Sequence, residues 1–225
     1  MTEPSQGSLA LIHTVTSLVP TFEKLIQLHL PGWHPFNIID ESLLRLTIKE
    51  NTLSTKTARR VTGYVSSAID AGADAILVTC SSIGPAIDAY QSFCPVPLVR
   101  VDIGMADEAI RRNGRIGILA TLKTTLDPTR DLLMNRANAI NRSASITHRV
   151  CTDAFICLSA GDNAAHDAII REEIIAMSAE VDIIVLAQAS MARVLSHKDL
   201  RSVEIPILSS PELGVLALKS QLDFT

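Results

Sequence analysis

Short apolar runs alternate along the chain with longer amphipathic stretches, and this pattern predicts an α/β fold. The clearest run, Ala75-Ile76-Leu77-Val78, is continuous and aliphatic, as in a parallel strand buried on both faces. It follows a predicted helix over 53–71 and precedes Gly84-Pro85, a pair that favours a helix start. Strands and helices that alternate in this way form parallel βαβ units with right-handed crossovers.

The first half of the chain carries three further predicted strands. They cover 9–14, 36–39 and 96–102, with a helix over 20–30 and a loop over 31–35 between the first two. The second strand is expected to end at Asp40. A helix over 105–112 then closes the series.

The same order of segments returns later in the chain. The runs 115–121, 144–148, 181–190 and 205–208 align with 8–14, 36–40, 73–82 and 96–99 at offsets of 107 to 109 residues. Four matches in one order indicate an internal repeat. We therefore predict two pseudo-symmetric, doubly wound parallel-sheet lobes, formed by residues 1–104 with 208–225 and by residues 105–207, with the active site in the cleft between them.

Polar residues follow the predicted strand ends, where open α/β sheets bind ligands. In a pseudo-symmetric pair of lobes, equivalent strand ends would meet at one cleft. Cys80 would then face Gln188, and Thr14 would face Thr121. Asp40 would answer His148.

Composition excludes several classes of protein. The chain has 225 residues, of which 47% are hydrophobic and 20% charged, and a formal net charge of −4 without a basic tract. This charge argues against nucleic acid as a partner. No run approaches the length of a membrane span or a signal peptide, and the four cysteines lack zinc-site spacing. We expect a cytoplasmic protein without a structural metal or a membrane partner.

Cys80 is the leading candidate for chemistry, because its thiol lies among hydroxyl side chains at a predicted strand end. A thiolate can act as base, acid or nucleophile, and a helix start just beyond Cys80 would lower its pKa. The alternative is a small buried cysteine that only packs.

Hydroxyl and amide groups near the predicted strand ends could bind a substrate. Gln188, with the backbone N–H groups of Ala189 and Ser190, could hold a carboxylate or carbonyl oxygen, although simple space-filling is the alternative. Candidate donors to a carboxylate or enolate are Thr14, Thr79, Ser81, Ser82 and Thr121. Their alternative role is hydrogen bonding at strand ends and helix caps. Lys123 and Arg100 could attract an anion.

Three motifs give the chain a resemblance to the aspartate/glutamate/hydantoin racemase superfamily over essentially its whole length. They are Val-Thr-Cys-Ser-Ser at 78–82, Ile-Gly-Ile-Leu-Ala-Thr at 116–121 and Asp-Ile-Ile-Val-Leu at 182–186. The resemblance implies racemisation or epimerisation of amino acids or related compounds without a cofactor. In typical members one cysteine from each lobe faces each side of the reacting carbon.

The sequence departs from that pattern in the second lobe. Cys80 matches the first cysteine, but Gln188 stands at the position of the second, and an amide does not exchange protons near neutral pH. Asp40 and His148, both predicted at strand ends, are the candidates for a second proton carrier. His13 should point to the opposite face of its strand and ranks lower.

The leading prediction is a cofactor-independent isomerase that acts on a small carboxylate or carbonyl carbon acid, with Cys80 as proton carrier. One alternative is a one-thiol lyase resembling the arylmalonate decarboxylases, whose single cysteine lies on the other lobe. Another is a catalytically silent binding protein. We also expect a homo-oligomer.

Overall fold

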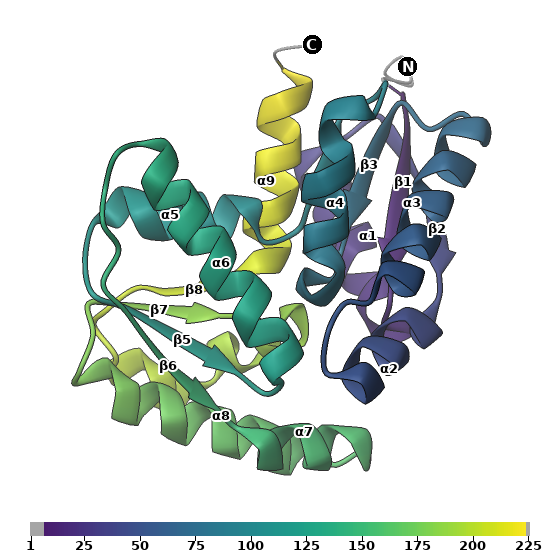
Figure 1. Ribbon diagram of the computed structural model, residues 1–225. Coiled ribbons are helices and arrows are strands. Elements are labelled where there is room, and N and C mark those ends of the chain that lie inside the picture. Colours follow the sequence, from purple (N-terminus) through teal and green to yellow (C-terminus); the bar gives the residue numbers. More distant parts are fainter. Residues whose placement is uncertain (1–6, 224–225) are drawn as a thin grey trace. The chain divides into compact units, whose positions relative to one another are not determined.

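Within residues 7–223, the part of the chain that the structure describes, eight strands form two four-stranded parallel sheets. The computed structural model divides into two units, and each contains one sheet with helices around it (Figure 1). The first lobe comprises residues up to Gly104 together with those from Pro211, and the second comprises Met105–Ser210.

The first sheet has the strand order β2-β1-β3-β4. Its strands are β1 (Gly7–His13), β2 (Trp33–Ile39), β3 (Ala75–Val78) and β4 (Leu98–Arg100). The helices of this lobe are α1 (Val19–His29), α2 (Glu41–Glu50), α3 (Thr55–Asp70), α4 (Gly84–Tyr90) and nearly all of α9 (Ser210–Leu222). Short 3-10 helices are η1 (Thr16–Leu18), η2 (Ser81–Ile83) and η3 (Gln91–Phe93).

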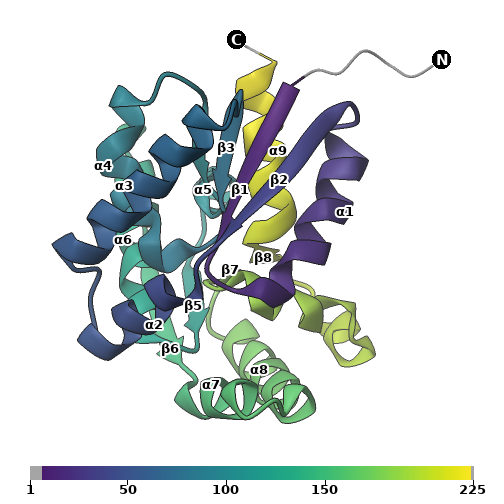
Figure 2. The same cartoon turned by 90° about the vertical axis from the view of Figure 1, so that its right-hand side faces the viewer.

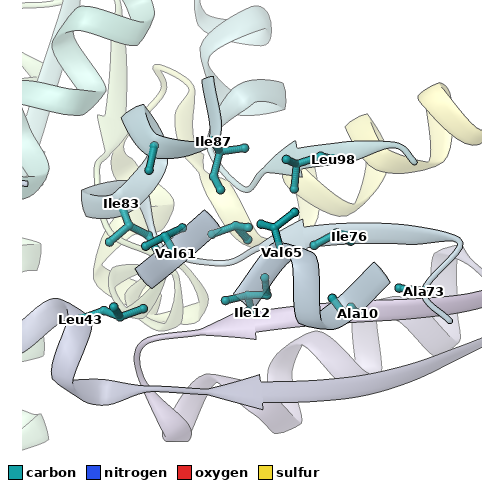
Figure 3. Packing of buried hydrophobic residues seen from close by; sticks show 13 residues of the cluster. Ala10, Ile12, Leu43, Val61, Val65, Ala73, Ile76, Ile83, Ile87 and Leu98 are labelled. Atoms are coloured by element: carbon teal, nitrogen blue, oxygen red, sulfur yellow. The ribbon is translucent and has the colours of Figure 1, made fainter. Parts of the chain in front are cut away.

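Both faces of the first sheet are buried, as the unbroken apolar run of β3 predicts. On one face Val61 and Val65 of α3 pack with Ile76 of β3 (Figure 3). On the other, α1 and α9 cover the sheet (Figure 2), and Phe22 and Val215 belong to the same buried cluster. Helices on both faces make this lobe doubly wound.

The second sheet repeats the plan with the order β6-β5-β7-β8. Its strands are β5 (Ile116–Ala120), β6 (Ile146–Val150), β7 (Ile183–Leu186) and β8 (Ile207–Ser209). The helices are α5 (Ile103–Arg112, entering this lobe at Met105), α6 (Lys123–Ala139), α7 (Thr152–Ser159) and α8 (Asn163–Ser178), with η4 (Ala189–Ser196) and η5 (Lys198–Ser202). α6 and α8 lie on opposite faces of the sheet (Figure 1).

The predicted fold class, two parallel-sheet lobes of similar plan, is confirmed by the identical strand orders. The chain returns to the first lobe between Ser210 and Pro211, three residues beyond the predicted return at residue 208. Leu208 and Ser209 stay with the second lobe because they pair with Val185 and Leu186 of β7.

The first lobe differs from the sequence prediction in two places. β2 begins at Trp33 and includes Pro35, which the sequence pattern placed in a loop. Proline is tolerated there because β2 is an edge strand of its sheet. Helix α2 was not predicted, although Leu43 and Thr47, four residues apart, form its buried face.

No helix within residues 7–223 is long and apolar enough to cross a membrane. The same residues include no group of three or more His, Cys, Asp or Glu side chains placed to hold a metal ion.

Candidate functional site

Cys80 lies at the turn from strand to helix that the sequence predicts. It comes two residues after β3 and is the N-cap residue of η2, which leads directly into α4 at Gly84. Its backbone is still extended, with φ −132° and ψ 116°. The thiol therefore stands at the carboxyl edge of the first sheet, where parallel sheets bind ligands.

The Cys80 thiol is held neutral by its surroundings. Burial raises its pKa, and hydrogen bonding from the Thr14 hydroxyl, the backbone N–H groups of Ser82 and Ile83, and the Ser82 hydroxyl opposes this rise. Burial is the larger effect, so the predicted lowering of the pKa is wrong. The donors that the turn supplies are nevertheless those that a thiolate at this position would need.

Two buried hydroxyl groups next to Cys80 have capacity for a ligand. Thr14 follows β1 and Ser81 begins η2. Among residues 7–223 the Ser81 hydroxyl has no hydrogen-bond partner, and the Thr14 hydroxyl contacts only the Cys80 sulfur. Buried hydroxyls in proteins are usually paired. The Ser81 hydroxyl is therefore available to donate to a substrate oxygen, and the Thr14 hydroxyl can donate to a sulfur anion.

Thr79 is committed elsewhere. Its hydroxyl lies 2.9 Å from Nδ1 of His13 and 3.2 Å from the carbonyl oxygen of Ile12. The other ring nitrogen of His13 lies 2.9 Å from Oδ1 of Asn37, an acceptor, so it carries the proton and Nδ1 accepts from Thr79. The Thr79 proton is thus engaged inside the lobe, and Thr79 does not fit its expected role as a substrate donor.

Asp40 is a helix cap. It is the N-cap residue of α2 and accepts from the backbone N–H of Ser42 at 2.9 Å and from its hydroxyl at 2.6 Å. Arg60 Nη2 and the Tyr64 hydroxyl donate to its second oxygen at 2.5 and 2.7 Å.

These bonds keep the Asp40 carboxylate charged. Burial acts to raise its pKa, but the hydrogen bonds from Ser42 and Tyr64 and the charge of Arg60 outweigh burial, and the pKa is lowered. A carboxylate in this state does not take up a proton near neutral pH, so Asp40 does not fit the expected role of second proton carrier.

Gln188 occupies the position in the second lobe that Cys80 occupies in the first. It comes two residues after β7 and is the N-cap residue of η4, with φ −121° and ψ 135°. The backbone N–H of the preceding residue bonds to the central strand in both lobes, from Thr79 to Ile12 and from Ala187 to Leu119, each at 3.0 Å. The predicted equivalence of the two strand ends is therefore present in the backbone.

The Gln188 side chain is oriented by Thr121. Its Oε1 accepts from the backbone N–H of Thr121 at 2.7 Å and from the Thr121 hydroxyl at 2.9 Å. The amide nitrogen is then the end available to a ligand, and it only donates. Ala189 and Ser190, the first residues of η4, supply the neighbouring backbone N–H groups.

His148 is misplaced by the sequence alignment. It lies in the middle of β6, opposite Ile118, because the strand continues two residues further. Its side chain is exposed. The true counterpart of Asp40 is Cys151, since both backbone N–H groups bond to the last residue of the central strand, His13 or Ala120. His148 therefore does not stand at a strand end.

These features define a class of protein: two parallel α/β lobes of one plan, with polar groups at equivalent strand ends. The chain belongs to the Asp/Glu/Hydantoin racemase family, whose model matches residues 11–218. Membership supports a racemase or isomerase activity on a small amino acid or carboxylate.

Solved structures share the fold at low sequence identity. Aspartate racemase from Picrophilus torridus matches with a TM-score of 0.72 and 16% identity, over 96% of this chain and 94% of that one. Allantoin racemase from Klebsiella pneumoniae gives 0.70 and 16%, over 97% and 89%. Glutamate racemase from Bacillus anthracis gives 0.68 and 14%, over 98% and 83%. No curated protein matches the sequence.

Proposed function

We propose that the protein is a cofactor-independent isomerase that acts on a small carboxylate or carbonyl carbon acid, with Cys80 as proton carrier. The observation that carries the proposal is the setting of the thiol: a strand end with hydrogen-bond donors from Thr14, Ser82 and Ile83 around the sulfur. The family supports the reaction class.

The raised pKa of Cys80 suits the removal of a weakly acidic proton. A thiolate becomes a stronger base as the pKa of its thiol rises, and the neutral thiol can return the proton to carbon. In the proposed step the C–H proton moves to the Cys80 sulfur, and the electron pair of the C–H bond enters the carbonyl or carboxylate as an enolate. The Ser81 hydroxyl, which has no partner among residues 7–223, and the Thr14 hydroxyl are the proposed donors to that oxygen, with Ser82 beside them.

Gln188 is proposed to bind a substrate oxygen. Its amide nitrogen, together with the N–H groups of Ala189 and Ser190, offers donors and no proton carrier. Cys80 and Gln188 are both proposed to act on the same substrate. We propose no catalytic role for Asp40 or His148.

The Gln188 geometry favours a second candidate, a one-thiol lyase. Loss of CO₂ from a substrate leaves an enediolate, and the Cys80 thiol can protonate it on one face. This reaction needs a single proton donor, which fits an amide bonded to Thr121 at the other position.

The test is an NMR screen of small carboxylates and hydroxy acids in D₂O with three proteins: the natural chain, Cys80→Ser and the control Cys157→Ser on α7. We expect solvent exchange, inversion or CO₂ loss with the natural chain and the control, and none with Cys80→Ser. Turnover that survives Cys80→Ser would refute the proposal. Ligand binding without any exchange or CO₂ loss would identify a binding protein.

Gln188→Cys separates the two enzyme candidates. It places a thiol where the family pattern has its second cysteine. A one-thiol lyase should then racemise its own chiral product. An isomerase that already inverts its substrate should lose turnover instead.

A further inference from the structure

A buried ion cluster lies behind the turn that carries Cys80. Arg100, the last residue of β4, donates from Nε and Nη2 to the two oxygens of Asp102 at 2.7 and 2.9 Å. Its Nη1 bonds to Asp88 of α4. Arg100 is 4% exposed and Asp102 is fully buried. Since its donors are engaged and it is buried, Arg100 does not attract a substrate, contrary to the expectation from the sequence.

The guanidinium of Arg100 packs directly against the first residue of α4. A Cβ atom built on Gly84 would lie 2.4 Å from Cζ and Nη2 of Arg100, a distance at which something must move. Gly84 has an ordinary helical φ of −51°, so the need for glycine is steric. The start of α4 is therefore seated on the ion cluster.

The start of α4 in turn sets the donors around Cys80. Only the three residues of η2 separate Cys80 from Gly84. The backbone N–H groups of two of them, Ser82 and Ile83, lower the pKa of the thiol, and the Ile83 N–H also bonds to the Cys80 carbonyl oxygen at 3.3 Å. A shift of Gly84 would move these N–H groups, because a segment of three residues is too short to absorb the displacement.

We propose that Arg100 is a positioning residue, which acts through Gly84 to hold the Ser82 and Ile83 N–H groups against the Cys80 sulfur. The forked contact with Asp102 gives the guanidinium a defined plane, and the bond to Asp88 ties that plane to α4. An apolar pair could fill the same space, but it would not define orientation in this way. The assignment builds on the proposed role of Cys80.

The test compares Arg100→Lys and Asp88→Asn with a matched control. Lysine keeps the charge and loses the fork. Asp88→Asn weakens only the ion pair between Arg100 and the half-exposed Asp88, and it keeps the buried Arg100–Asp102 pair. It is the variant to test if Arg100→Lys does not fold. The control is Arg115→Lys, because Arg115 forms a similar fork with Asp182 before β5 in the other lobe.

The readout is the pH profile of Cys80 alkylation by iodoacetamide, followed by mass spectrometry of the Cys80 peptide. We expect Arg100→Lys to move the midpoint upward by about one pH unit, which is roughly tenfold less thiolate at a given pH. Asp88→Asn should move it less in the same direction, and Arg115→Lys should leave it unchanged. Folded Arg100→Lys and Asp88→Asn proteins with the natural profile would overturn the assignment.

Alkylation needs no substrate. An absence of turnover would therefore count against the proposed function and leave this inference standing. A cluster that only stabilises the fold would lower the melting temperature without moving the alkylation profile.

Discussion

The oxygen of the Gln188 amide accepts two hydrogen bonds from a single residue, Thr121, through its backbone N–H and its hydroxyl. This double contact fixes the amide so that its nitrogen is the end left to a ligand. Two substitutions test this contact. In Gln188→Glu a carboxylate oxygen replaces the amide oxygen, but nothing replaces the NH₂ group as a donor.

Gln188→Glu should keep both bonds to Thr121 and lose the donor. We expect a melting temperature close to that of the natural protein and turnover of an anionic substrate reduced roughly 10- to 100-fold, the loss of one charge-assisted hydrogen bond. Kinetics on a substrate found in the D₂O screen would measure this.

Thr121→Val is the companion variant. It should lower the free energy of unfolding by about 1 kcal/mol, because it removes one hydrogen bond. Full activity of Gln188→Glu on a carboxylate substrate would contradict the proposal that the Gln188 amide nitrogen donates to a substrate oxygen.

The natural Cys80 thiol should titrate late. Because burial raises its pKa despite the nearby donors, alkylation by iodoacetamide should be slow near neutral pH and rise with a midpoint above the ordinary value of 9.0. Peptide mapping distinguishes Cys80 from Cys151, whose pKa is raised to about 11, chiefly by burial. A Cys80 midpoint below pH 8 would show that the hydrogen-bond donors outweigh burial.

Asp40→Ala should destabilise the first lobe by about 2 kcal/mol, because it removes the N-cap of α2 and the partner of Arg60. The folded-state pKa of Asp40 is lowered, so its stabilisation is fully present above the ordinary value of about 3.9. It is lost as the pH falls through the lowered pKa. Urea unfolding at pH 7 and pH 3 should show the two proteins converging at the lower pH.

Asp40→Asn keeps a capping oxygen and removes the charge. We expect this variant to retain proton exchange at the substrate carbon. Loss of inversion in a folded Asp40→Asn protein, with exchange on one face retained, would restore Asp40 as a proton carrier.

His13 should make stability fall in mild acid. Burial lowers its pKa below 6.5 against the opposing effects of the Asn37 hydrogen bond and the Glu23 charge. Above pH 6.5 the ring is neutral in both states. As the pH falls toward the lowered value, the unfolded chain takes up a proton before the folded one, and the free energy of unfolding decreases.

The pH series of unfolding free energies between 7 and 5 should therefore be flatter for His13→Gln. His34→Gln, at an exposed position on the same lobe, is the control and should keep the natural slope. Equal slopes for all three proteins would mean that His13 is not buried as a neutral ring.

The sequence predicts the buried strands well and the edges of the sheets poorly. β3 matches its prediction because a strand covered on both faces is apolar at every position, and all four of its residues are buried. β6, an edge strand with mostly polar residues, carries no such pattern, and the prediction stopped it two residues short, at His148. The wrong prediction that His148 stands at a strand end follows from that one boundary.

Contacts between distant residues set the surroundings of two other candidate residues, Asp40 and Thr79. Asp40 reads from the sequence as a carboxylate at a strand end, and only the fold brings Arg60 and Tyr64 of α3 onto it. The same holds for Thr79 and His13, which lie 66 positions apart and share one hydrogen bond. The residue type indicates which hydrogen bonds and proton transfers each side chain could make. The partners that the fold brings to it determine which of these it makes.

The division of the chain between the lobes has a consequence for synthesis on the ribosome. The second lobe is one continuous segment, whereas the core of the first needs Val215 and Leu218 of α9 beside Phe22. Domains generally fold as their residues emerge. The amino-terminal lobe is made first, yet it lacks part of its core until the last helix is translated. The second lobe is therefore complete before the first, although its residues are made later. Nascent chains that stop before residue 211 should leave one face of the first sheet partly uncovered.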